Sequence, residues 1–418
     1  MCPIRISSSS RSNVWGKNLE KFSKHMYVLL LIPLILIAYD LGGPGIIIAQ
    51  DFPFLDTPEY AIHRLWLWID RGSIDGFEFV PRFPIIGLSH LLGLVGLHSD
   101  TATKAMVLLG FSVSSFSFYF SYHSFLASRI TGFKNSLRIS GLLASLFYAY
   151  NVWSFNRIHH WYLWIGYAIL PLFSISVYFT FKRTNNWKYV LASILLWTIS
   201  SSTPHMALFY GVILIVTFLG FLSHALYKRT KKGTIQYVKG VFLIFVFYIL
   251  VNMYWIYPYI LSSQSGVVSP NYELTEEVIQ LLSREGSFLN TVRILAYWLN
   301  SDVHIFADSF VSTLWPLASF TVPVVVFLSL FIRKFLKFSI IFVSIALIGI
   351  LLAMGSNSPL KYHSLILSSP SLSEFAWLLR DSDKLSFATT FAYSILLGLT
   401  SWKILSIISN WRNDKKIK

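Results

Sequence analysis

Long apolar runs separated by short polar segments dominate the chain. A helix needs about 20 residues to cross the roughly 30 Å of hydrocarbon in a bilayer. Runs that approach or reach this length predict an all-α, polytopic membrane protein with about ten transmembrane helices. The predicted spans are 26–48, 104–126, 138–153, 164–181, 188–200, 206–227, 239–259, 310–332, 338–354 and 386–407.

One apolar segment, 83–97, is short for a span and contains Pro84, Gly87 and Gly93. If it does not cross, the cytoplasmic pieces hold most of the basic residues but only Glu20 and Asp414 among the acidic ones. If it crosses, every later basic loop falls outside. The positive-inside rule therefore predicts a helix that lies on or dips into the outer face, with both termini cytoplasmic.

Composition agrees with this interpretation, because 55% of the 418 residues are hydrophobic, 13% are charged and the mean hydropathy is +0.59. The net charge of +15 comes from short basic clusters between apolar runs. Orientation in a membrane explains such clusters better than a nucleic-acid partner does. The single cysteine, Cys2, excludes an intramolecular disulfide and a thiolate metal site.

The predicted organisation follows from these spans. A disordered basic cytoplasmic leader, 1–25, precedes a signal anchor and a transmembrane module at 26–259 that includes the outer loop 49–103. A second large outer loop, 260–309, leads to C-terminal helices at 310–408, which enclose the outer loop 355–385. The tail 409–418 is basic and cytoplasmic. Functional groups are expected on the extracytoplasmic side of the cell membrane.

Three carboxylates open the first outer loop: Asp51, Asp56 and Glu59. A carboxylate at a membrane boundary can act as a general base on an acceptor hydroxyl or hold a divalent cation. The alternative is that Asp56 caps a helix over 58–70 while Glu59 favours the N-terminal dipole of that helix. An apolar stripe on the helix 58–70 suits a juxtamembrane position.

A basic group lies in the next outer loop, where Arg157, His159 and His160 occur among aromatic residues. The aromatic residues are typical of an interfacial belt. A guanidinium at this depth can bind a lipid-linked phosphate, and the histidines can add hydrogen bonds. Adjacent histidines point apart on a helix, so no metal site is predicted. His205, in a tight outer turn, is either a helix-end group or a substrate ligand.

The last outer loop ends in a charged segment that contains Arg380 and Lys384, four residues apart. On a helix the two would share a face. Either Asp381 and Asp383 pair with them, or they face an anionic substrate.

Six segments together resemble the GT-C superfamily, the multi-spanning glycosyltransferases that use polyprenyl-phosphate donors. They are most similar to the arabinofuranosyltransferase branch and to related archaeal and bacterial membrane proteins. The resemblance is ordered along nearly the whole chain. It rests on segments 51–56, 141–153, 166–172, 252–258, 355–360 and 379–385.

The resemblance implies an inverting transferase of the cell envelope with a first-loop carboxylate as catalytic base. That role falls on Asp51 first and Asp56 second, and Arg157, Arg380 and Lys384 would bind the donor phosphate. Glu59, His159, His160 and His205 are the other expected substrate contacts. The partners would be a polyprenyl-phosphate-linked sugar, membrane lipids and a glycan, lipid or protein acceptor.

Two other hypotheses stay open at the sequence level. A transporter or flippase of a lipid-linked or anionic substrate needs polar groups near mid-membrane, for which Asp40 and Asn252 are the candidates. A catalytically silent assembly subunit with the GT-C fold needs none of the catalytic groups.

Overall fold

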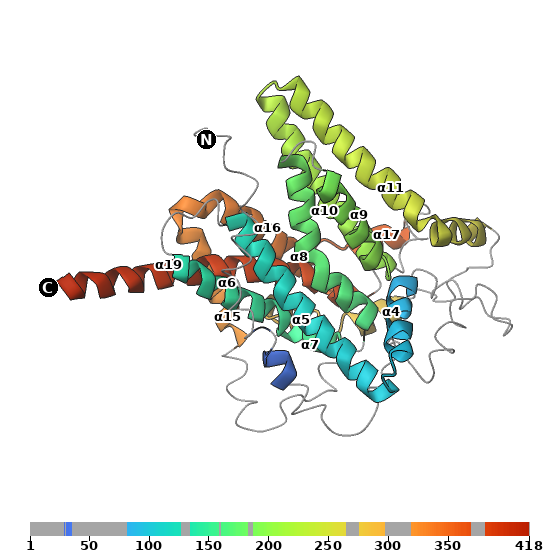
Figure 1. Ribbon diagram of the computed structural model, residues 1–418, viewed down its shortest axis with the longest axis horizontal. Helices are drawn as coiled ribbons and strands as arrows, with labels where there is room; N and C mark the ends of the chain where they lie inside the picture. The colour runs from blue at the N-terminus through green and yellow to red at the C-terminus, as the bar shows by residue number, and fades with distance from the viewer. Residues whose placement is uncertain are drawn as a thin grey trace.

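A computed structural model shows the chain as a bundle of helices (Figure 1). It describes residues 29, 31–35, 82–126, 134–158, 160–182, 187–264, 276–296, 319–368 and 381–417. No strand occurs among them. The all-helical class predicted from the apolar runs is confirmed for this part of the chain.

The described residues form both long helices and short helical elements. The longer helices are α4 (Phe83–Leu94), α5 (Ser99–Leu126), α6 (Lys134–Ala149), α8 (Trp161–Lys182), α9 (Trp187–Ser200), α10 (Pro204–Tyr227), α11 (Lys231–Gln264), α16 (Leu336–Ala353) and α19 (Ser386–Ile417). The shorter elements are α7 (Val152–Asn156), α12 (Glu276–Leu282), α13 (Phe288–Val292), α15 (Thr321–Phe327), η2 (Leu328–Phe331), η3 (Arg333–Phe335), η4 (Gly355–Asn357), α17 (Tyr362–Ser368) and η6 (Ser382–Leu385).

Six described helices are long and apolar enough to cross a membrane: Thr101–Leu126, Trp161–Lys182, His205–Tyr227, Gly233–Tyr257, Arg333–Ala353 and Ser382–Trp411. Three shorter apolar helices accompany them, at Phe83–Leu94, Trp187–Ser200 and Thr321–Phe331. Most of the predicted first span lies outside the described residues, as do the leader 1–25 and the predicted helix 58–70. The described helices are thus compatible with a helical membrane protein.

The predicted span 138–153 differs from the observed helix, because α6 ends at Ala149. Asn151 has an extended backbone, with φ −83° and ψ 166°, and its side chain accepts a hydrogen bond from the amide of Ser154. This is the geometry of a helix N-cap. Asn151 therefore stops one helix and starts the next, the short α7.

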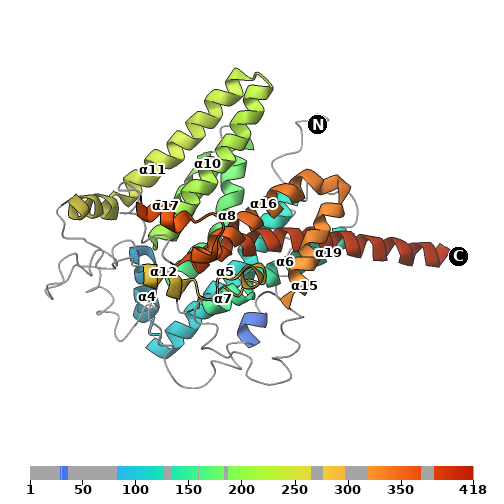
Figure 2. The same cartoon turned by 180° about the vertical axis from the view of Figure 1, so that it is seen from behind.

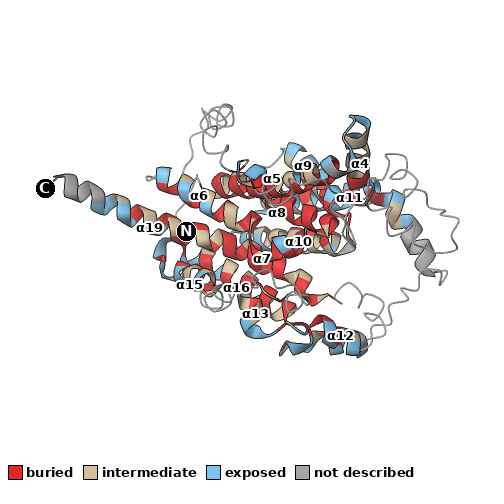
Figure 3. Cartoon of the chain, turned by 90° about the horizontal axis from the view of Figure 1, so that it is seen from below, coloured by how far each residue is buried: buried red, intermediate tan, exposed pale blue. Residues whose placement is uncertain are grey.

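Helix α8 is the centre of the fold. It is apolar on all sides and most of its residues are buried, which is the pattern of a core helix. It packs against α5, α9 and α10, while α19 packs along α6 and α16. Figure 3 shows the buried residues concentrated where these helices meet.

The α10–α11 hairpin projects from this core, and α19 extends along the long axis of the molecule (Figures 1 and 2). Large apolar side chains on the hairpin are exposed, among them Leu208, Val216, Phe242 and Leu250. A monomeric protein in water rarely exposes an apolar surface of this extent. Exposure of these side chains is compatible with helices that face lipid.

Contacts between distant segments join parts of the chain that have the same predicted side. Phe125 stacks on Phe338 with ring centroids 5.1 Å apart, next to two predicted cytoplasmic loops. At predicted outer segments, the amide of Ser356 donates to Oγ of Ser283 at 3.0 Å. Both contacts agree with the predicted sides, and the polar cluster described next lies next to the second contact.

Candidate functional site

Arg157 and Asp383 form an ion pair in the interior of the protein. The two residues are 226 positions apart, and their side chains are only 1% and 2% exposed. Nη2 of Arg157 donates to Oδ2 of Asp383, and Nη1 lies 2.9 Å from Nδ1 of His160. The segment after α7 and the turn before α19 thus meet through charged groups.

The backbone that presents Arg157 is held by a network of buried polar groups. Arg157 is the C-cap of α7, whose N-cap is Asn151. The Asn151 amide donates to the carbonyl of Tyr148 at 2.7 Å and to the hydroxyl of Tyr167 at 3.2 Å. Because every one of these polar groups is buried, their hydrogen bonds fix one arrangement of the turn.

Tyr148 and Tyr167 join α6 to α8 next to this turn. Each hydroxyl donates to the main-chain carbonyl of the other residue, at 2.5 and 2.7 Å. Their rings stack with centroids 4.2 Å apart. Arg157 is therefore attached to the rigid centre of the fold and not to a free loop.

Asp383 lies in η6, the single 3₁₀ turn that leads into α19. Within the same turn, Nζ of Lys384 lies 2.5 Å from Oδ2 of Asp381. Of the two alternatives for Lys384, the structure has the pairing with a neighbouring aspartate. Asp383 instead reaches Arg157, a contact that the sequence did not suggest.

Two buried oxygens beside the ion pair carry no hydrogen bond from any described residue: Oδ1 of Asp383 and Oγ of Ser382. Most buried polar atoms have such a partner. Both atoms are in η6, so this turn presents unused hydrogen-bonding capacity next to Arg157.

The junction between two predicted outer loops lies against the same turn. Gly355 has φ +60°, a left-handed conformation that favours glycine. A Cβ at this position would overlap the hydroxyls of Ser283 and Ser382. Nδ2 of Asn357 also donates to the carbonyl of Ser283 at 2.8 Å. The segment 355–360 is thus a docking point for the end of α12.

Tyr362 covers the cluster from α17. Its hydroxyl donates to the carbonyl of Leu352 at 2.7 Å. Burial raises the pKa of the Tyr362 phenol, and the negative charge of Asp383 raises it further. The phenol is therefore protonated at neutral pH and serves as a donor.

The structure brings together only some of the predicted site residues. Arg157 and His160 are in contact, and Lys384 follows Asp383 directly. His205 lies in the first turn of α10, on a different element. Asp51, Asp56, Glu59, His159 and Arg380 lie outside the described residues. Within the described ranges, no group of three or more His, Cys, Asp or Glu side chains could hold a metal ion.

The chemical capacity of the cluster follows from its charges. The carboxylate of Asp383 neutralises Arg157, and Asp381 neutralises Lys384. A phosphate that binds to Arg157 must therefore share the guanidinium with Asp383 or displace it. An anionic ligand would bind an arginine side chain whose orientation is already fixed by the residues around it.

The scan against protein-family models, the search of curated proteins and the search of solved structures each find no match to the chain.

Proposed function

We propose that the chain is a membrane glycosyltransferase that moves a sugar from a polyprenyl-phosphate donor to an acceptor on the extracytoplasmic face of the cell membrane. The observation that carries the proposal is the buried contact of Arg157 with Asp383 and His160. It gathers a phosphate-binding type of side chain, a histidine and a carboxylate from two segments that are both predicted to lie outside.

The proposed orientation has both termini in the cytoplasm and about ten spans. Contacts at each end of the bundle support it, because they join segments of equal predicted side: Phe125 with Phe338 at one end, and Ser283 with Ser356 at the other.

In the proposed reaction, Asp51 takes the proton from an acceptor hydroxyl, with Asp56 as the second candidate for this base. The acceptor oxygen attacks the anomeric carbon while the bond from that carbon to the phosphate oxygen breaks. The lipid phosphate leaves with the electron pair. Arg157, together with Arg380 and Lys384, stabilises the negative charge that develops on it.

A second candidate function, a catalytically silent subunit of a glycosyltransferase assembly, is favoured by the neutralisation of Arg157. A buried ion pair satisfied by its own partners is also what a structural contact requires.

The transporter hypothesis gains less support. Asn252 is buried in α11, where it donates to Oγ1 of Thr198 at 3.0 Å and accepts from Nε1 of Trp255 at 3.0 Å. The bond to Thr198 joins α11 to α9, and the bond from Trp255 lies within α11, so both have a structural role.

Transfer of radiolabelled sugar from polyprenyl-phosphate donors in proteoliposomes tests the proposal. We expect Asp51→Asn to keep the fold and to lower the rate by about 10²- to 10⁴-fold, the usual effect of removing a general base. Asp414→Asn, in the predicted cytoplasmic tail, is the matched control and should retain full activity.

The outcomes of this assay separate the hypotheses. Full activity in Asp51→Asn moves the base to Asp56 or Glu59. Absence of transfer by folded wild-type protein, over a panel of donors and acceptors, favours the silent subunit. Loss of function in Asp40→Asn with intact Asp51→Asn favours a transporter.

A further inference from the structure

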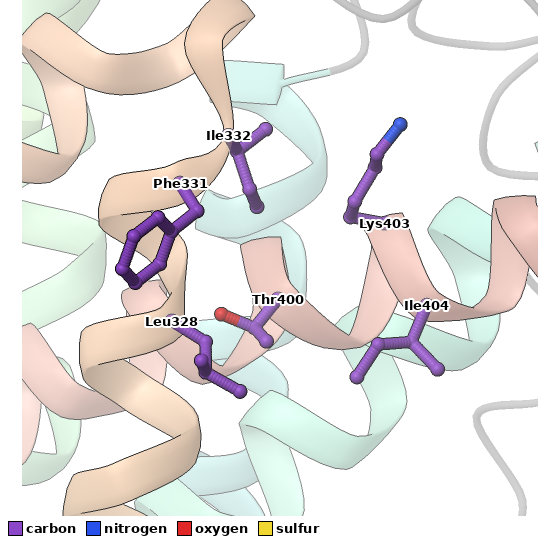
Figure 4. Close-up of a pocket in the computed structure, with 6 residues that line it drawn as sticks. All are labelled: Leu328, Phe331, Ile332, Thr400, Lys403 and Ile404. Carbon is purple, nitrogen blue, oxygen red and sulfur yellow. The ribbon is translucent and has the colours of Figure 1, made fainter.

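An apolar groove of about 270 Å³ lies between η2 and α19, remote in sequence from Arg157 and Asp383 (Figure 4). Its lining residues are Leu328, Phe331, Ile332, Thr400, Lys403 and Ile404. The side chains of Leu328, Phe331 and Ile404 are largely exposed, and that of Phe331 is 81% exposed. The walls of the groove are thus apolar surface that faces the surroundings of the bundle.

A hydroxyl without a partner lies at the floor of this groove. Thr400 is only 3% exposed, and its Oγ1 carries no hydrogen bond from the described residues. In Figure 4 this oxygen is directed towards Phe331 and Leu328. A buried hydroxyl normally has a hydrogen-bond partner. The hydroxyl of Thr400 could therefore donate a hydrogen bond to an oxygen of a bound ligand.

Positive charge surrounds one end of the groove. Lys403 is exposed, and Figure 4 shows its amine extending beyond the apolar walls on the side of Ile332. Arg333 and Lys334 follow Ile332 directly in η3. Phe335 packs edge-on against Trp402, with ring centroids 5.7 Å apart, so η3 lies beside the turn of α19 that carries Lys403.

The two segments that carry this charge contain no acidic residue near it in sequence. The sequence has no Asp or Glu between positions 309 and 373, and none between 384 and 413. Lysines at the end of a membrane helix keep their aliphatic stems in the apolar region and their amines at the interface. Clusters of Lys and Arg at this depth attract anionic lipid head groups.

We propose that the groove is a binding site for one anionic phospholipid. An acyl chain lies against Leu328, Phe331 and Ile404, the hydroxyl of Thr400 donates to an ester carbonyl, and the amine of Lys403 binds the phosphate. Thr400 and Lys403 are three residues apart on one face of α19, so they are separated by about 4.5 Å along the helix axis. This spacing fits the adjacent ester and phosphate groups of one lipid. The site is independent of the proposed transferase activity.

Native mass spectrometry of the full-length protein in detergent, titrated with dioleoyl-phosphatidylglycerol or dioleoyl-phosphatidylcholine, tests this proposal. We expect the wild-type protein to retain one phosphatidylglycerol more strongly than phosphatidylcholine. Lys403→Gln should weaken phosphatidylglycerol binding by about fivefold, the effect of one lysine near a charged surface, and weaken phosphatidylcholine binding less, because the choline of that lipid offsets its phosphate.

Two further variants separate the parts of the site. Thr400→Val removes a hydroxyl that has no protein partner, so the protein should stay folded while both lipids bind more weakly. Leu328→Trp should fill the groove and reduce binding of both lipids. Lys231→Gln, at an exposed lysine that opens α11, is the matched control and should behave as wild type.

Three results would overturn the proposal. The first is equal retention of the two lipids by the wild-type protein. The second is a loss in Lys231→Gln as large as that in Lys403→Gln, which would indicate attraction to net charge alone. The third is unchanged binding in both Thr400→Val and Leu328→Trp.

Discussion

Arg157 and Asp383 neutralise each other inside the protein although 226 positions separate them in the sequence. One comes from the connection between α6 and α8, and the other from the turn that opens α19. The pair therefore ties the first half of the helical core to its C-terminal helix.

Removal of either member of this pair should destabilise the protein. Arg157→Ala or Asp383→Asn leaves the other charge buried and unpaired, a change that typically costs about 3–5 kcal/mol. A double variant, Arg157→Met with Asp383→Leu, should cost much less than the sum of the single variants. Thermal unfolding in detergent measures all three. Additive losses would contradict the pairing.

Gly355→Ala should also be destabilising, by about 1–3 kcal/mol, because φ is +60° and a methyl group would overlap two serine hydroxyls. Gly220→Ala, inside α10, has open space at its Cβ and is the matched control. We expect the control to be neutral or slightly stabilising. Unfolding temperatures of the two variants in the same detergent provide the measurement. Equal temperatures would argue against the junction with Ser283 and Ser382.

Asn151 has two separable roles that substitution can distinguish. Asn151→Asp keeps the side-chain oxygen that caps α7 but loses the amide donor to Tyr148 and Tyr167, and Asn151→Ala loses both. Loss of a cap costs about 1 kcal/mol, and an unsatisfied buried group about 1–3 kcal/mol. Both variants should unfold at lower temperature than wild type. If Asn151→Ala were as stable as wild type, neither role would hold.

Labelling with an impermeant thiol reagent tests the proposed orientation. Ser287 and Lys231 are both exposed and lie on opposite predicted sides. In a Cys2→Ser background, Ser287→Cys should react from outside intact cells, and Lys231→Cys only after permeabilisation. Ser136, in a predicted cytoplasmic loop, is buried in α6 and would make a poor reporter. Labelling of both positions from the same side would overturn the proposed orientation.

The sequence predicts the helical class well because each long apolar run can satisfy its backbone hydrogen bonds only as a helix in lipid. The end of α6 was harder to predict, since the apolar run continues to Trp153 while Asn151 caps a new helix. Length and hydropathy carry no information on that local hydrogen bond.

The candidate site was predictable only where its contacts are local. Lys384 and Asp381 are three residues apart, and such a pair can be expected from spacing. Arg157 stood out as a basic residue in an aromatic outer loop. Its partner Asp383 could not be identified, because two acidic residues, Asp381 and Asp383, precede Lys384, and only the folded position of η6 brings one of them to Arg157.

Helix α19 connects the buried ion pair to the apolar groove. Asp383 precedes its first turn, and Lys403, at the edge of the apolar groove, lies some five turns further on. At 1.5 Å per residue the separation is about 25–30 Å, close to the thickness of the hydrocarbon layer. Under the proposed orientation, one continuous helix therefore runs from the groove at one leaflet to the ion pair at the other, and a tilt of α19 would move Lys403 and Asp383 together.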